Sequence, residues 1–214
     1  MPGIFSFKRH WLSFTFLAIS FITFFGVNHG GNLPVEILDQ FGFFPKASQA
    51  DWIYRTITSD WLYLTPFHFY SCVITLSVLI YLCERFHSHR FLLIFFGLVS
   101  FFDDYVNYFL ILKPFQFLRP ELYHSMITEK DVGSSLILSA TVGLLLIQLD
   151  RYREFIFVFL SIAFVFGTVF STSHYSSLVL NLNHFVFLCI GYLTGKIFML
   201  IKRNSKRLHE ECER

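Results

Sequence analysis

The sequence predicts an all-α membrane protein, a single domain of six membrane-spanning helices with both termini in the cytoplasm. Hydrophobic residues make up 54% of its 214 residues, only 15% are charged and 30 are phenylalanine, unlike an ordinary soluble domain. The apolar residues form six runs, and Lys and Arg gather at alternate junctions between them. Residues 1–214 are too few for a membrane core plus a separate soluble domain, so we expect any functional site to lie among the helices.

Each apolar run is near the roughly 20 residues, at about 1.5 Å each, that a helix needs to cross a bilayer. The first follows Lys8-Arg9-His10 and resembles a signal peptide, but no A-x-A-like cleavage site follows it, so we expect a retained span. The six predicted spans are Trp11–Val27, Phe67–Cys83, Phe91–Leu112, Ser135–Leu149, Phe155–Phe170 and Leu178–Ile201.

The distribution of basic residues predicts the orientation. Cytoplasmic segments of membrane proteins carry an excess of Lys and Arg, and four basic groups fall at alternate junctions, the last forming a short tail over residues 202–214. The chain is therefore expected to be an integral, multi-pass protein, of the plasma membrane or, in a bacterium, the inner membrane. The four groups are Lys8 and Arg9; Arg85 and Arg90; Arg151 and Arg153; and Lys202, Arg203, Lys206 and Arg207.

A net charge of only +2, with the cations in loops, argues against a nucleic-acid partner.

Three segments are then left on the outer side. The loop from Asn28 to Pro66 is rich in aromatic residues, which settle at the lipid–water boundary, so we expect a partly helical, interfacial platform. The second outer loop is Lys113 to Asp131, and Thr172 to Ser177 is a very short turn. We expect the third span to end near Phe102, with Asp103 and Asp104 at the outer surface; the alternative is that these two acids face a wet cavity.

The fourth run is short for a span, so Ser135 at its start should lie beneath the outer surface. Polar groups at that depth either bond a neighbouring helix or are functional. A serine becomes a good nucleophile only when an adjacent base takes its proton, and His184 in the sixth run is the candidate base. The alternative is structural: His184 is a buried, hydrogen-bonded imidazole, while Ser134 and Ser135 cap a helix.

Small residues allow the fourth and sixth runs to approach each other closely. Gly191 and Gly195, four residues apart, form a small-residue surface on the sixth run. The fourth run offers matching small residues at Ser139, Ala140 and Gly143. This pairing is expected to bring Ser135 and His184 within hydrogen-bond reach.

Further residues have the spacing of a known family. Arg55 follows an aromatic residue and precedes Thr58 by three residues and His68 by thirteen, and Glu84 comes twelve residues after Cys72. Together with Gly133-Ser134-Ser135, His184 and Gly191, this order resembles the rhomboid intramembrane serine proteases over about residues 50 to 195. The resemblance implies a six-helix rhomboid-like bundle.

The resemblance also implies roles for individual residues. Ser135 would be the nucleophile and His184 its general base and later general acid, a dyad without Asp, metal or cofactor. The oxyanion would be bound by the Ser135 backbone N–H, by His68 and by the side chain at position 72. Structural roles would fall to Arg55, Glu84, Gly133 and Gly191. The substrate would be a single-span transmembrane protein in the lipid bilayer.

Two positions depart from the family pattern. The family usually has Asn where this chain has Cys72, and a thiol is a poorer hydrogen-bond donor than an amide. It usually has a small residue directly after the serine, where this chain has Leu136. These departures favour an alternative function, a catalytically inactive rhomboid-like protein that binds membrane clients. A third alternative is a six-span transporter with Asp103, Asp104, His68 and His184 along an ion path.

Overall fold

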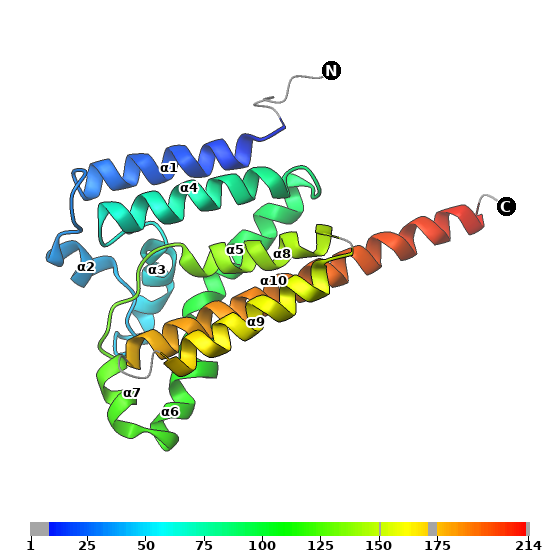
Figure 1. The fold of residues 1–214 in the computed structure, drawn as a ribbon. Helices are drawn as coiled ribbons and strands as arrows, with labels where there is room; N and C mark the ends of the chain where they lie inside the picture. Colours follow the sequence, from blue (N-terminus) through cyan, green and yellow to red (C-terminus); the bar gives the residue numbers. More distant parts are fainter. Residues whose placement is uncertain (1–8, 150, 171–174, 213–214) are drawn as a thin grey trace.

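The computed structural model describes residues 9–149, 151–170 and 175–212, and helices dominate it throughout (Figure 1). Each of the six apolar runs is helical, which confirms the all-α prediction. The only β-type pairing among the described residues is an isolated bridge between Phe43 and Asp131. The helices that hold all or most of each run are α1 (Trp11–Val27), α4 (Pro66–Cys83), α5 (His89–Val106), α8 (Ser135–Leu146), α9 (Arg153–Phe170) and α10 (Tyr175–Cys212).

Three described stretches are long and apolar enough to cross a membrane: Pro66–Cys83, His89–Leu118 and Val179–Ser205. Two further apolar helical stretches, Trp11–Val27 and Ser135–Leu149, are shorter. The chain is thus an all-helical protein with candidate membrane-spanning helices. Six spans and two cytoplasmic termini stay predictions.

The sequence explains where α4 and α5 begin. Thr65 precedes α4, and its Oγ1 accepts a hydrogen bond from the His68 backbone N–H at 3.1 Å. Pro66 occupies the first helical position, where its missing N–H is not needed. Ser88 caps α5 in the same way, accepting from the Phe91 N–H at 3.3 Å. Side-chain caps of this kind satisfy backbone donors that the first turn leaves open.

The expected end of the third span near Phe102 is wrong. Helix α5 continues to Val106 and passes into a π-helical segment, η1 (Asn107–Leu112), and then into α6 (Lys113–Leu118). Asp103 and Asp104 are only 4% and 3% exposed. They are buried because the first outer loop packs over α5, as the contact between the rings of Trp52 and Tyr105 at 5.5 Å shows.

Short helices gather at one end of the bundle. The predicted first outer loop contains α2 (Val35–Phe41) and α3 (Gln49–Ser59), and the second contains α6 and α7 (Pro120–Met126). We call these four helices the platform end (Figure 1). The first loop is therefore partly helical, as expected.

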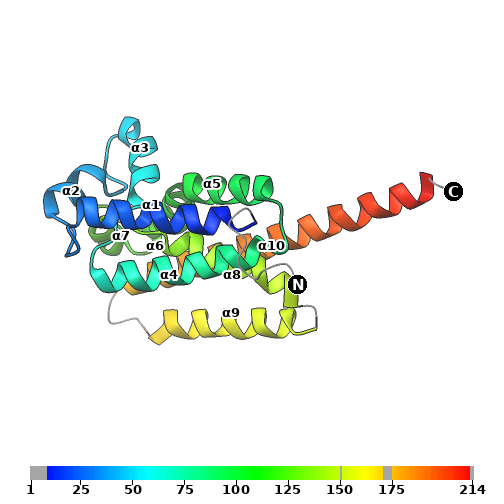
Figure 2. The ribbon, with the colours of Figure 1, turned by 90° about the horizontal axis from the view of Figure 1, so that it is seen from above.

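The core lies between α4, α5, α8 and α10, where Leu76, Leu92, Leu144 and Phe187 are buried together. Figure 2 shows α9 at the edge of the bundle and α10 extending well beyond it. The predicted tail over residues 202–214 begins as a continuation of α10, which runs to Cys212. The predicted turn from Thr172 to Ser177 falls partly outside the described residues, since 171–174 are not described.

Candidate active site

Helices α8 and α10 approach so closely that backbone meets backbone. A Cβ atom added to Gly191 would lie 1.9 Å from the Ala140 carbonyl oxygen, and one added to Gly143 would lie 2.2 Å from that of Leu188. Contacts this short leave room only for hydrogen. The glycines are thus the reason that the two backbones can touch, and the expected small-residue packing is present.

The same contacts give the register of α8 against α10. Gly191 lies opposite Ala140, and Gly195, farther along α10, lies opposite Ile147, farther along α8. Contacts that advance together along both helices show that the helices run parallel, as Figure 1 also shows.

Extending this register toward the platform end brings Ser135 and His184 to similar heights. Ser135 lies five residues before Ala140, about 7.5 Å along α8, and His184 lies seven before Gly191, about 10.5 Å along α10. Positions spaced by three or four residues share a helix face. His184, seven residues before Gly191, therefore shares its face, whereas the eight residues from Ser135 to Gly143 leave Ser135 about 80° to the side of the face that Gly143 presents to α10.

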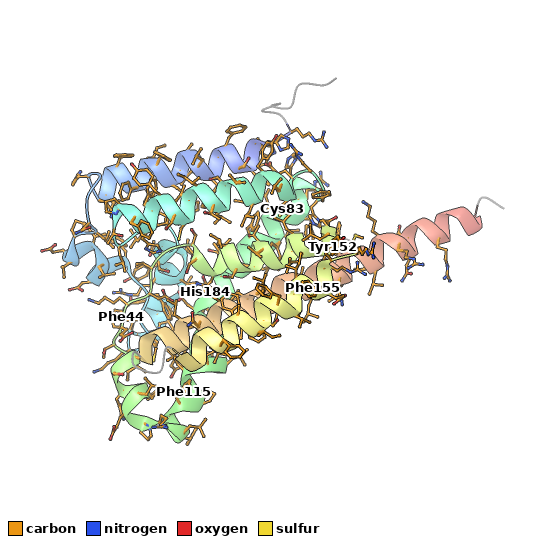
Figure 3. All side chains as sticks on the ribbon, viewed as in Figure 1. Phe44, Cys83, Phe115, Tyr152, Phe155 and His184 are labelled. Carbon is orange, nitrogen blue, oxygen red and sulfur yellow. The ribbon has the colours of Figure 1, made fainter. Side chains whose placement is uncertain are left out.

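The two side chains do not form a hydrogen bond with each other. Among the described residues no bond joins Ser135 Oγ to the His184 imidazole, and none at all involves that Oγ as donor or acceptor. His184 lies on the part of α10 beside α8 (Figure 3), with the ring of Phe164 from α9 stacked on it at 6.4 Å. The backbone of Leu180, one turn earlier, also interacts with the imidazole.

Ser134 is the neighbouring hydroxyl and the alternative nucleophile. It is 1% exposed, and its Oγ lies 3.3 Å from the Tyr63 hydroxyl, to which it is hydrogen-bonded. Ser135, in contrast, is half-buried, at the first position of α8. Of the two serines, Ser135 is better placed to meet a substrate.

Gly133 brings His68 to the turn before α8. Its φ of +101° is in the left-handed region that favours glycine, and a Cβ there would lie 2.8 Å from His68 Nε2. The Gly133 N–H donates to the Ser59 carbonyl at 2.8 Å, which attaches the turn to the end of α3. The imidazole of His68 therefore lies directly against the turn that precedes Ser135, and its oxyanion-binding role stays a prediction.

Cys72 lies one turn after His68, on the same face of α4. It is 9% exposed and packs in a cluster with Phe24, Tyr63 and Phe69. The ring of Tyr63 also contacts the ring of His68, with centroids 5.7 Å apart. Position 72 thus lies in a buried aromatic cluster one turn from His68, and its role as an oxyanion donor stays a prediction.

Arg55 ties the platform together through backbone carbonyls. Its Nη1 donates to the carbonyl of Gly42 at 2.7 Å and to that of Asp39 at 3.0 Å, and its guanidinium lies over the Phe44 ring at 4.9 Å. Thr58 Oγ1 donates to the Phe41 carbonyl at 2.9 Å. These bonds join α3 to the end of α2, the kind of contact that a structural role needs.

Glu84 occupies the opposite end of the bundle and joins α4 to α1 and α5. Its carboxylate accepts hydrogen bonds from the Leu12 N–H and the Ser13 Oγ, each at 2.9 Å. His89 Nε2 at the start of α5 lies 3.3 Å from it, and the Glu84 side chain is fully buried. A buried carboxylate with this many donors holds three helix ends together.

A group of buried carboxyls behind the Gly133 turn was not expected from the sequence. Asp60 accepts a hydrogen bond from the Ser100 hydroxyl, and Asp103 lies close to it. Asp104 and Asp131 interact with each other and with Asp60. The four residues come from the end of α3, from α5 and from the loop before α8, so no sequence motif marks them. Burial and the proximity of like charges favour the protonated form of such carboxyls.

Burial raises the pKa of Asp60 to about 7 and that of Asp131 to about 6. Asp60 therefore binds a proton in the folded protein up to about pH 7, while in the unfolded chain it releases the proton near its ordinary value of 3.8. Because the folded state holds more protons between these values, this group's contribution to stability is lost as pH rises from about 4 to 7.

His87, between α4 and α5, acts in the opposite direction. Burial, assisted by Lys202, lowers its pKa to about 4, so its contribution to stability is gained as pH rises from about 4 to 6.5.

The raised pKa of Asp60 is tested by comparing the thermal unfolding midpoints of wild type and Asp60→Asn across pH 5 to 8. The substitution mimics protonated Asp60, and His87 is present in both proteins. We expect the midpoint of the variant to rise relative to wild type as pH increases. A difference that stays constant, or an equal trend in the half-buried control Asp51→Asn, would contradict the assignment.

No metal centre is indicated: within the described part of the chain, no group of three His, Cys, Asp or Glu side chains is placed to hold an ion. The geometry thus places His68 against the Gly133 turn that precedes Ser135, with His184 at a similar height on the neighbouring helix. No family model, no curated protein and no solved structure matches the chain.

Proposed function

We propose that the protein is a multi-pass membrane protein and a rhomboid-type intramembrane serine protease. In this proposal, Ser135 and His184 form a catalytic dyad that hydrolyses peptide bonds of single-span membrane proteins. The observation that carries the proposal is the parallel, backbone-to-backbone contact of α8 and α10, because extending its register brings Ser135 and His184 to heights within about 3 Å of each other along the two helices. His68 beside Gly133 supports it independently.

The chemistry follows from these positions. Ser135 Oγ attacks the scissile carbonyl carbon while the His184 imidazole takes the hydroxyl proton and then gives it to the leaving amine. The resulting acyl-enzyme is hydrolysed by water that His184 deprotonates in turn. The oxyanion is bound by the Ser135 backbone N–H and by His68, two donors held by the start of α8 and by α4. Catalytic hydrogen bonds are often long without substrate, so the dyad is expected to close when substrate binds.

A catalytically inactive, client-binding protein is the second candidate function. Two observations favour it: a thiol occupies position 72, and no hydrogen bond joins Ser135 to His184 among the described residues. In this alternative the same surface holds a membrane helix without cutting it. The two candidates share a fold and differ in whether Ser135 is nucleophilic.

A fluorophosphonate probe separates the two candidates, because it phosphonylates only an activated serine. We expect the full-length protein in detergent to be labelled, and Ser135→Ala and His184→Ala not to be. Ser134→Ala is the matched control and should keep labelling, since Ser134 is buried and bonded to Tyr63. Absence of labelling in a folded wild type, or equal labelling of Ser135→Ala, would exclude the protease.

A further inference from the structure

A cavity of about 500 Å³ lies at the far end of the bundle from the candidate active site. It opens just beyond Gly195, where α8 and α10 are still in close contact: a Cβ atom added to Gly195 would lie 2.7 Å from the Ile147 side chain. Here α8 ends and α9 begins, while α10 continues alone (Figure 1). In Figure 3, Tyr152 and Phe155 mark this start of α9. The cavity is thus a wedge between the three helices.

The lining of this wedge is strongly basic on one part and apolar on the other. Four cationic side chains line it, Arg153 from α9 and Lys196, Lys202 and Arg203 from α10. The rest of the lining consists of Ile147, Met199 and Leu200. Cations beside apolar side chains match a ligand that has an anionic head and a hydrocarbon body.

Only part of this positive charge is neutralised by the protein. Glu154 lies 2.9 Å from Lys196 Nζ and 3.6 Å from Arg153 Nε. Lys202 and Arg203 are exposed and have no ion pair within the described residues. Among the described residues, two of the four cations therefore share one carboxylate, and the two without an ion pair lie on α10 where it leaves the bundle.

We propose that this wedge binds the head group of an anionic phospholipid. The phosphate lies between Lys202 and Arg203 and the other two cations, and the lipid's glycerol and first methylenes contact Met199 and Leu200. Basic pockets between helices on the cytoplasmic side are suited to such head groups, each Lys or Arg adding to the attraction. The inference rests on the membrane placement proposed above and is independent of the serine chemistry.

Bound lipid would add a bridge between the three helices beside the ion pair of Glu154 with Lys196, which joins α9 to α10. Helices α8 and α10 carry Ser135 and His184 at their other ends, so a lipid that fixes the wedge also fixes the register on which the dyad depends. Anionic lipid is therefore expected to raise the thermal unfolding midpoint of the full-length protein.

The experiment uses the full-length protein in nanodiscs of phosphatidylcholine, with or without phosphatidylglycerol. We expect a higher unfolding midpoint and retained phosphatidylglycerol in native mass spectrometry for wild type, and about thirtyfold weaker retention for the double variant Lys202→Gln/Arg203→Gln, since each cation contributes about a fivefold effect. The matched control, Lys113→Gln/Arg119→Gln, removes two cations from the platform end and should behave as wild type.

Three results would overturn the inference: equal midpoints in both kinds of disc, equal loss of lipid in the control variant, or the same shift from inorganic phosphate added to phosphatidylcholine discs, which would identify a free anion as the ligand. Failure of the membrane placement itself is seen separately, as protein that does not enter either disc. Failure of the protease proposal leaves this experiment unaffected, because its readouts do not depend on Ser135.

Discussion

Gly191→Ala is expected to reduce fluorophosphonate labelling by about 10²-fold and to destabilise the protein by about 1–3 kcal/mol. The added methyl carbon would lie 1.9 Å from the Ala140 carbonyl oxygen, whereas ordinary contact begins at 3.4 Å. The obstacle is backbone on both sides, so no side-chain rotation relieves it. Helices α8 and α10 must separate by about 1.5 Å, which carries Ser135 away from His184.

The chain offers a matched control for this substitution. Gly97 lies inside α5 and would meet nothing within 4 Å on gaining a Cβ. Gly97→Ala should therefore leave labelling unchanged and leave the unfolding midpoint equal or slightly raised, because alanine favours helix over glycine. Similar behaviour of Gly191→Ala and Gly97→Ala in labelling and melting would show that close approach of α8 and α10 is not what assembles the site.

Cys72→Asn is expected to increase the rate of labelling by about 10²-fold. The tetrahedral phosphonyl adduct carries an oxygen in the place of the oxyanion, and a single oxyanion donor is worth about 10²–10³ in rate. A thiol donates weakly and an amide strongly. Because Cys72 follows His68 by one helical turn, a side chain at 72 and the His68 imidazole project from the same face of α4.

Two further variants isolate the amide group as the cause. Cys72→Val removes the thiol without adding a donor and should not be faster than wild type. Cys189→Asn places the same amide on α10 and should leave the rate unchanged. Since position 72 packs against Tyr63 and Phe69, the melting temperature of each variant is measured alongside. A folded Cys72→Asn protein that labels no faster than wild type would remove position 72 from the oxyanion site.

Local patterns in the sequence predict the helices well. The run Trp11–Val27 coincides with α1, and Ser135 is the first residue of α8. Gly191 and Gly143 were expected at a helix contact because only small residues permit it, and their carbonyl contacts bear this out. Signals of this kind are local, since they depend on residue size and hydrophobicity along one helix.

The structure departs from the sequence-based expectations where distant segments meet. The sequence around Asp103 and Asp104 predicts the end of a span. It does not indicate that α3 packs over these two residues, or that Asp60 and Asp131 lie beside them. The π-helical continuation after Val106 was also not expected, because a polar Asn107 and a following Lys113 usually mark a surface. In the structure, Asn107 is buried. Tertiary burial, which single-segment patterns do not carry, decides both features.

The most direct test of the central claim is a crystal structure of the protein after reaction with a fluorophosphonate. We expect phosphorus bonded to Ser135 Oγ, a ring nitrogen of His184 within hydrogen-bond distance of that oxygen, and the His68 imidazole directed at the phosphonyl oxygen. An adduct on another residue, or an adduct on Ser135 with the His184 ring many ångströms away on a lipid-facing side of α10, would contradict it.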